Sequence, residues 1–232
     1  MKLVLVHGSG GCGLNYYYQT RHFPDADAVD LPGHPRGASC SSVELYTEWL
    51  RGYIWGKACR DVVLGGHSLG GAIVLTYALK YPEEVKGLVL IGTGARLRVH
   101  PDYLAECEKA ITDGASRQRW LEARAANYAK VEPRFRETLL KKAEEVGPAA
   151  MLNDLLCCDR FDILGRIAQV RVPALVCQGS EDIMTPVKYG RFLAEKIAGA
   201  KIQVFEGGTH QVMLEQPEAV NQAIEGFLRG LR

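Results

Sequence analysis

Six short apolar runs recur along the chain, each four to seven residues long, and most are apolar on both faces of an extended strand. They occupy residues 3–6, 27–31, 61–66, 87–92, 173–179 and 201–207. Strands that are apolar on both faces are typical of a parallel sheet, because helical crossovers cover both of its sides. The sequence therefore predicts an α/β domain, doubly wound, with a mostly parallel sheet of about six strands.

Helical patterns fill the intervals between these runs. Residues 42–57 place apolar and aromatic side chains on one stripe and turn the charged side chains outward. The stripe consists of Leu45, Trp49, Leu50, Tyr53 and Ile54. Residues 69–80 are apolar nearly all round, which is typical of a buried helix, and residues 216–231 predict an amphipathic terminal helix. We expect these helices to pack on the faces of the sheet.

One interval breaks the alternation. About eighty residues separate Gly92 from Pro173, where a crossover needs on the order of a dozen. Turn signals at Pro101, Gly114, Pro133 and Gly147–Pro148 divide this interval into helix-forming segments. We therefore expect a small helical cap over the sheet. The predicted boundaries are 98–167 for the cap, with 1–97 and 168–232 forming the core.

A serine lies between glycines in the stretch GGHSLGG, residues 65–71. The stretch follows a predicted strand and opens a predicted helix, which is the placement that exposes a serine hydroxyl at the carboxyl edge of a sheet. Gly66 and Gly70 flank Ser68 at two residues on either side, and we expect a Cβ at either position to clash in so tight a turn. The bare pattern is weak evidence, and its context strengthens it.

Five motifs stand in an order that resembles the α/β-hydrolase family, in its carboxylesterase-like serine hydrolase branch. They are LVHGSGG, DLPGHPRG, GHSLGG, GSEDIMTP and GGTH, and together they extend over nearly the whole chain. The resemblance implies the α/β-hydrolase fold. It also implies a serine nucleophile at Ser68, an acid at Asp182 and a histidine at His210, in that chain order.

The chemistry explains why a histidine is needed. A serine hydroxyl is a weak nucleophile until a neutral imidazole accepts its proton and later returns it to the leaving group. His210 lies in a glycine-containing loop just past the last predicted strand, where strands deliver functional residues. We expect His67 to point to the opposite side of the turn from the nucleophile. The other histidines are His7 at the end of the first strand, and His22, His34 and His100 in loops.

The acid should lie on the exit loop of the preceding strand. Asp182 stands in QGSEDIMTP and matches the acid-bearing loop of the family. Its expected task is to hold the imidazole tautomer and stabilise the imidazolium. Glu181 is the alternative within the same loop, and Asp159 and Asp162 are rivals at the end of the predicted cap.

An acyl transfer also needs hydrogen-bond donors for the developing oxyanion. The backbone N–H of Leu69 stands at the start of a predicted helix, and the resemblance implies the N–H of Ser9 as the second donor. The alternative for GSGGCG, residues 8–13, is a phosphate-binding loop. No G-K-[ST] follows it, and the nearest candidate for a ribose-binding acid is Asp30, so nucleotide binding is disfavoured.

Net charge and cysteine content limit the binding partners and the cellular compartment that we expect. A formal net charge of +1 provides no positive field for nucleic acid or an anionic membrane surface. The seven cysteines include no C-x-x-C pair, which favours reduced thiols in a cytoplasmic protein. The first residues run into glycines too soon for a secretory signal, and no apolar stretch is long enough to span a bilayer. No motif for a metal appears, and we expect no cofactor.

We therefore expect a serine hydrolase that cleaves a small-molecule carboxylic ester or thioester through an acyl-serine intermediate. Trp120, Met184 and Met213 are candidates for the substrate pocket, although each is equally compatible with core packing. The same triad would also serve a carbon–carbon bond hydrolase, a perhydrolase or a hydroxynitrile lyase. A further alternative is a small-ligand receptor of the same fold with little turnover. The oligomeric state is left open.

Two features depart from the common family pattern. The chain starts directly at MKLVLVHG, without the strand hairpin that precedes this strand in most members. We therefore expect a sheet that lacks this hairpin. The stretch GHPRG carries Pro35 where a glycine is frequent. Neither departure touches the predicted triad.

Overall fold

The computed structural model, which describes residues 1–231, contains one six-stranded sheet in which every neighbouring pair of strands is parallel. Its strands are β1 (Lys2–Val6), β2 (Asp27–Val29), β3 (Val62–His67), β4 (Val85–Ile91), β5 (Ala174–Gly179) and β6 (Lys201–Phe205). Their order across the sheet is β2-β1-β3-β4-β5-β6, so the chain reverses its direction of travel after β2. The predicted doubly wound α/β fold is confirmed.

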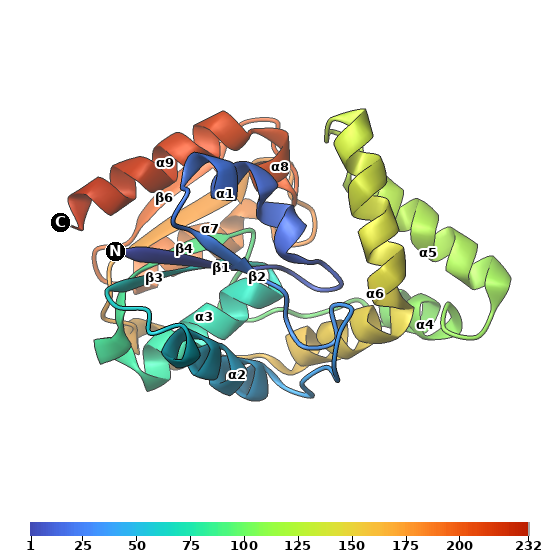
Figure 1. Cartoon of the computed structure of the whole chain (residues 1–232), viewed down its shortest axis with the longest axis horizontal. Coiled ribbons are helices and arrows are strands. Elements are labelled where there is room, and N and C mark those ends of the chain that lie inside the picture. Colours follow the sequence, from blue (N-terminus) through green and yellow to red (C-terminus); the bar gives the residue numbers. More distant parts are fainter. Residues whose placement is uncertain (232) are drawn as a thin grey trace.

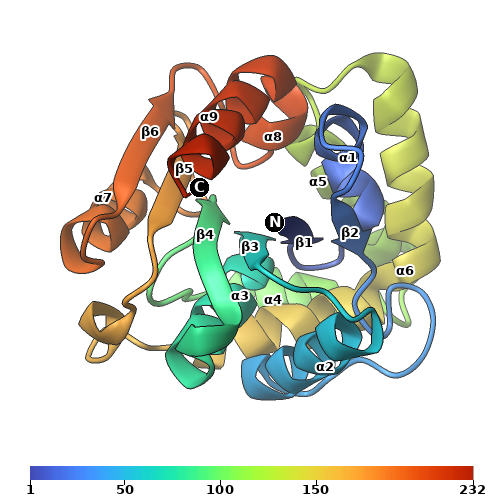
Figure 2. The same ribbon diagram turned by 60° about the vertical axis from the view of Figure 1, so that its left-hand side comes forward.

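Helices cover both faces of this sheet (Figures 1 and 2). The helices outside the long β4–β5 connection are α1 (Tyr17–His22), α2 (Val43–Gly56), α3 (Leu69–Lys80), α7 (Val187–Lys196), α8 (Val212–Glu215) and α9 (Pro217–Gly230). Short 3-10 turns occupy Gly13–Tyr16, Pro82–Glu84 and Ile167–Gln169. Helices α2, α3 and α7 pack on one face, and α1, α8 and α9 pack on the other. None of the helices within residues 1–231 has the length and apolar character needed to cross a membrane.

The strands show why both faces need cover. Val4 and Val6 point into the core under α2 and α3, whereas Leu3 and Leu5 point into the core under α8 and α9. Successive side chains of a strand alternate between faces, so a strand that is apolar throughout supplies two separate cores. The uninterrupted apolar runs in the sequence reflect this double burial.

Helix α2 is rotated relative to its predicted orientation. Leu45 was expected on the buried stripe, but its side chain is 51% exposed. The residue that is fully buried instead is Tyr46, while Leu50 and Ile54 are buried as expected. Tyr46 turns inward because its hydroxyl has a buried polar partner in a distant helix, which periodicity along one helix does not reveal.

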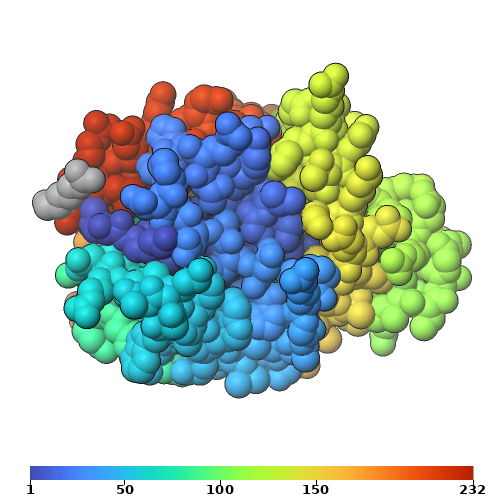
Figure 3. Space-filling model, viewed as in Figure 1, coloured from blue at the N-terminus to red at the C-terminus, as the bar shows by residue number. Residues whose placement is uncertain are grey.

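The connection between β4 and β5 holds three helices, α4 (Pro101–Lys109), α5 (Gly114–Asn127) and α6 (Pro133–Arg160). They stand beyond the carboxyl ends of the strands (Figure 1) and bulge out from one end of the molecule (Figure 3). Helix α6 is broken at Gly147, whose φ is 80°, and Pro148 opens its second half. Helices do fill the predicted interval, and the boundaries 98–167 stay a prediction.

Helix α3 approaches strand β1 so closely at one point that only glycine fits. A Cβ at position 70 would lie 2.0 Å from the carbonyl oxygen of Val6 and 2.7 Å from that of His7. Both neighbours are backbone atoms and do not rotate away as a flexible side chain would. This contact fixes the distance between the first turn of α3 and the end of strand β1.

We predict that Gly70→Ala lowers the free energy of unfolding by about 3 kcal/mol, because the added methyl group forces the helix off the strand. Urea denaturation measures this change. Gly226→Ala is the matched control, since a Cβ there has no neighbour within 4 Å and helix propensity raises stability by about 1 kcal/mol. Equal effects of the two substitutions would contradict the prediction.

Candidate functional site

Ser68 lies between the end of β3 and the start of α3 in a strained backbone conformation. Its φ of 52° and ψ of −115° are unusual for a residue with a side chain. The turn is held by hydrogen bonds from the Ser68 N–H to the carbonyl of Ile91 (3.0 Å) and to the Ser68 carbonyl from the Thr93 hydroxyl (2.9 Å). A Cβ at Gly66 would lie 2.2 Å from the Gly70 carbonyl oxygen, so the flanking glycines permit this turn, as expected.

His210 and Asp182 meet across two loops. His210 follows β6, Asp182 follows β5, and the Nδ1 atom of His210 lies 2.9 Å from Oδ2 of Asp182. Both side chains are nearly inaccessible to solvent. The structure thus brings together the histidine and the acid that the resemblance implied.

Asp182 is held by its own loop as well as by His210. Its Oδ1 accepts the backbone N–H groups of Met184 and Thr185, each at 2.9 Å, and its Oδ2 accepts from the Thr185 hydroxyl at 2.8 Å. Gln178 donates to the same oxygen at 3.0 Å. Burial alone raises the pKa of the carboxyl, but the nearby His210 and these donors outweigh it and hold the pKa below its usual value. Asp182 is therefore ionised at neutral pH.

The rival acids have other partners. Glu181 pairs with Lys130 at the surface (2.6 Å), and Asp159 accepts the backbone N–H of Val99 (3.1 Å). Asp162 forms a loose pair with Arg96 at 3.7 Å. None of the three contacts His210 within the described residues.

His67 does not point away from the site, so that prediction was wrong. Its ring lies 4.6 Å from the ring of His210, centroid to centroid, and its Nε2 donates to the His210 carbonyl at 2.9 Å. Burial, followed by the nearby His210, lowers the pKa of His67 well below its usual value, so this ring is neutral. Its position at the end of β3 was visible in the sequence, whereas its rotamer depends on the loop that carries His210.

The loop after β1 borders the same site, where Gly8, Ser9 and Gly11 line the cavity beside Ser68. The Gly11 N–H bonds the Gly8 carbonyl at 3.0 Å, and Gly10 adopts a left-handed φ of 59°. The N–H groups of Ser9 and Leu69 have no acceptor in the described part of the chain. That of Leu69 stands at the start of α3, where helix N–H groups lack intrahelical partners.

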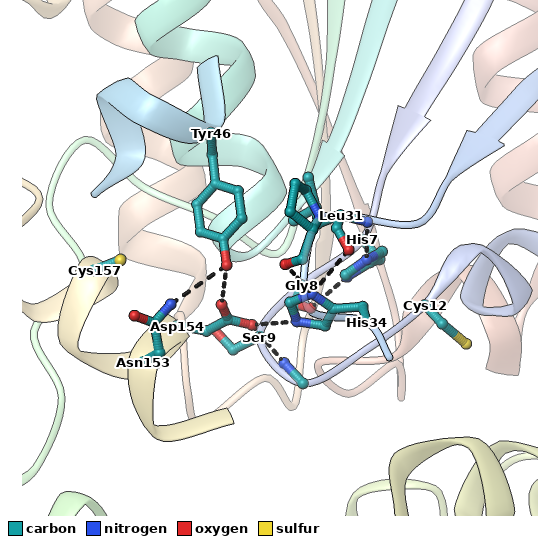
Figure 4. A network of polar contacts seen from close by, with 12 residues as sticks. His7, Gly8, Ser9, Cys12, Leu31, His34, Tyr46, Asn153, Asp154 and Cys157 are labelled. Carbon is teal, nitrogen blue, oxygen red and sulfur yellow. Dashed lines mark hydrogen bonds and ion pairs between the residues drawn. The ribbon is translucent and has the colours of Figure 1, made fainter. Parts of the chain in front are cut away.

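A buried carboxylate from the second half of α6 fixes this loop (Figure 4). Asp154 accepts from the Gly10 N–H at 2.9 Å, from the Tyr46 hydroxyl at 2.8 Å and from Nε2 of His34 at 2.8 Å. The other ring nitrogen of His34 faces the carbonyls of Leu31 and Pro32 at 3.2 and 3.1 Å.

Both ring nitrogens of His34 thus face acceptors only, which favours the doubly protonated ring. Burial lowers the pKa of His34, but the contact with Asp154 outweighs burial and raises it. The side chains of His34 and Asp154 are fully buried, so they form an ion pair shielded from water. Sequence reasoning placed His34 in a loop without a role and did not single out Asp154, because the contact joins residues 120 positions apart.

His7 braces the same region from the end of β1. Its Nδ1–H donates to the Gly8 carbonyl at 2.8 Å, and its Nε2 accepts the Leu31 N–H at 3.1 Å. Burial, followed by the nearby His34, lowers the pKa of His7 to about 4. A neutral His7 therefore links the two loops that follow β1 and β2.

A cavity of about 380 Å³ lies between the sheet edge and helices α4–α6. Ser68, His210, His67 and Ser9 line its sheet side. From the opposite side it is lined by Tyr103, Arg124, Tyr128, Met151 and Leu155. Met184 lies at its wall and is 38% exposed.

Two of the three predicted pocket residues do not line this cavity. Trp120 packs in the small core between α4, α5 and α6 with Cys107 and Met151, and Met213 is fully buried under the sheet. Both had core packing as their alternative, and the structure favours it. Among residues 1–231, no group of three or more histidine, cysteine, aspartate or glutamate side chains is arranged to hold a metal ion.

Residues 3–223 match the model of the alpha/beta hydrolase family. The chain is 26% identical to the pimeloyl-[acyl-carrier protein] methyl ester esterase of Neisseria meningitidis serogroup A, over 99% of this chain and 77% of that protein.

Two solved structures share the whole fold. A thermophilic esterase is 30% identical with a TM-score of 0.83, over 99% of this chain and 90% of that one. An esterase from Exiguobacterium antarcticum is 20% identical with a TM-score of 0.88, over 99% and 92% of the two chains, and shows likeness of fold alone.

We predict that Asp154→Asn lowers the free energy of unfolding by about 3 kcal/mol, because it leaves the buried His34 without its counter-charge. Urea denaturation at pH 7 measures this loss. Asp102→Asn is the matched control, since His100 and Asp102 form a His–Asp pair whose side chains are 75% and 94% exposed. A loss no larger than that of the control would show that the buried pair does not stabilise the fold.

A pH dependence follows from His7. Its pKa is about 4 in the folded chain, against about 6.5 when unfolded. The unfolded chain therefore binds the extra proton first as pH falls. Stability from a neutral His7 is present above pH 6.5 and is lost towards pH 4, by about 2 kcal/mol between pH 7 and pH 5.

His7→Asn lacks this titration, so we expect its free energy of unfolding to fall less than that of the unmodified chain over the same pH range. Denaturant unfolding of both proteins at pH 7 and pH 5 measures the difference between the two slopes. The other buried histidines are common to both proteins. Parallel slopes would contradict the assignment.

Proposed function

Because the chain belongs to the alpha/beta hydrolase family, we propose that it is a serine hydrolase that cleaves carboxylic esters through an acyl-serine intermediate. The observation that carries the proposal is one cavity lined by the strained Ser68, by His210 with its buried partner Asp182, and by the Ser9 loop. The likeness to a methyl ester esterase and to a thermophilic esterase supports an ester as the substrate. The proposal extends to thioesters, since the same acyl transfer applies to them.

In the proposed reaction, Ser68 Oγ attacks the carbonyl carbon of the ester while Nε2 of His210 takes the hydroxyl proton. Asp182 holds Nδ1–H of His210 and stabilises the imidazolium that forms. The carbonyl oxygen becomes an oxyanion, and the N–H groups of Ser9 and Leu69 bind it.

Collapse of the tetrahedral intermediate breaks the bond to the alkoxy oxygen, which leaves as an alcohol with the proton from His210. A water molecule then attacks the acyl-serine, and His210 takes a proton from that water. The second tetrahedral intermediate collapses, Ser68 regains its proton from His210, and the carboxylic acid is released. In one cycle an ester and a water molecule are converted to an alcohol and a carboxylic acid, and Ser68 and His210 return to their starting protonation states.

The proposal gives the helices beyond the sheet a role as a cap. Residues 98–167 would cover the cavity, and α5 and α6 supply the wall opposite Ser68. Met184 and the 90% exposed Ile183 lie at the same cavity, and we assign them to contacts with the apolar part of the substrate at its mouth.

We predict that Ser68→Ala lowers kcat for p-nitrophenyl butyrate by at least ~10⁴-fold, because the acyl-serine no longer forms. Initial rates of p-nitrophenol release measure this loss, and circular dichroism checks that the fold persists. Ser41→Ala, at an exposed serine before α2, is the matched control and should retain the rate of the unmodified chain. A fluorophosphonate probe should label the unmodified chain and not Ser68→Ala. Comparable turnover by the Ser68→Ala and unmodified proteins would refute the proposal.

A further inference from the structure

Arg124 is a buried cation in the wall of the cavity. It lies on α5, its side chain lines the cavity, and the residue is only 4% exposed. Its Nη2 donates to the Gly10 carbonyl and to the Tyr128 hydroxyl, each at 3.1 Å. Its Nε is buried and has no hydrogen-bond partner among the described residues.

The guanidinium also lacks a counter-charge. No ion pair with Arg124 occurs in residues 1–231. Asp154, the nearest buried carboxylate along this network, already accepts from Gly10, Tyr46 and His34. A buried charge without a partner is costly, so a ligand that supplied the missing negative charge would bind favourably here.

Tyr128, one helical turn after Arg124, offers a second donor. Its hydroxyl accepts from Arg124 and from Nδ2 of Asn15, the latter at 3.3 Å. The Asn15 amide is oriented by its oxygen, which accepts the Cys12 N–H at 3.0 Å. The Tyr128 hydroxyl hydrogen therefore has no acceptor within the described chain, and Tyr128 also lines the cavity.

The cavity as a whole favours an anion. Its lining contains Arg98, Arg124 and three histidines, His67, His100 and His210, but no aspartate or glutamate among the described residues. Asp182 and Asp154 do not line the cavity; Asp182 is fully buried against His210, and Asp154 is paired with His34. An acidic group on a substrate would thus meet a cation and a hydroxyl donor, and no carboxylate would repel it from the cavity wall.

We propose that Arg124, with Tyr128, binds a carboxylate that the substrate carries away from its scissile ester bond. The preferred substrates are then half-esters of dicarboxylic acids, in which one end reacts at Ser68 and the other pairs with Arg124. This inference rests on the proposed function. It goes beyond it by naming the charge of the substrate.

The competing explanation is that Arg124 only braces the oxyanion loop through the Gly10 carbonyl. A brace acts on every ester alike, because the same loop serves each reaction. A carboxylate site acts on charged esters alone. The ratio of kcat/KM for a charged ester to that for its uncharged counterpart separates the two.

The experiment compares monomethyl and dimethyl esters of the dicarboxylic acids from succinic to suberic, with the full-length protein at pH 7.5. We expect the unmodified chain to favour the monomethyl ester at its best chain length at least tenfold. Arg124→Gln should lower this ratio at least tenfold, and Tyr128→Phe should lower it a few-fold. Arg124→Lys, which keeps the charge, should retain part of it.

Arg119→Gln is the matched control, because Arg119 lies on the same helix and pairs with Glu106 at the surface (2.7 Å). It removes the same charge outside the cavity and should change the ratio less than twofold. A ratio near one in the unmodified chain at every length, or an equal loss on both esters in Arg124→Gln, would overturn the inference and leave Arg124 as a positioning residue.

A binding measurement tests the carboxylate site independently of ester hydrolysis. Titration calorimetry with monomethyl adipate and monomethyl suberate uses Ser68→Ala, which does not consume the ligand. We expect binding by Ser68→Ala and at least tenfold weaker binding by Ser68→Ala/Arg124→Gln. Binding of this kind without ester turnover by the unmodified chain would support the carboxylate site and refute the proposed hydrolysis. Equal binding by both proteins would overturn the carboxylate site alone.

Discussion

The buried ion pair between Asp154 and His34 is the interaction on which the site depends most. Asp154 comes from the helices beyond the sheet, His34 from the loop after β2, and the same carboxylate holds the Gly10 N–H of the loop after β1. Three segments far apart in the sequence therefore share one charge. In a low-dielectric interior such a network is rigid when every member has a partner, and it fails as a unit when one is removed. The loop that carries Ser9 is held in place by this network through the Gly10 N–H.

The sequence predicted the fold well because its evidence was local. Apolar runs gave the strands, and the order of the loops gave Ser68, Asp182 and His210, of which the structure brings the last two into direct contact. The sequence did not predict side-chain contacts between segments that are distant along the chain. Tyr46 turned inward in place of Leu45, and His67 turned towards His210, because each has a polar partner more than a hundred positions away along the chain. Helical periodicity and loop position contain no information about such partners.

The same limit applies to the cavity wall. Trp120 and Met213 are large and apolar, which the sequence does not distinguish from pocket residues, yet both are buried in packed cores. The sequence did not predict Arg124 as a cavity residue, because an arginine on a helix is usually at the surface. Its burial follows from the packing of α5 against α4 and α6 and from its contact with the loop after β1. Arg124 therefore comes from helices α4–α6, the segment whose packing was hardest to predict from the sequence.

The break in α6 at Gly147 separates two halves that pack in different places. The second half carries Asp154 and packs with α2 and α3, whereas Leu139 in the first half belongs to the core on the opposite face. Gly147 itself has open space around the position of a Cβ, and its left-handed backbone lets the chain change direction there. During divergence of related sequences, insertions and deletions before residue 147 are thus expected to reshape one wall of the cavity while the buried ion pair keeps its register. The first half of α6 is anchored in the core on the opposite face through Leu139, and the second half is anchored through Asp154.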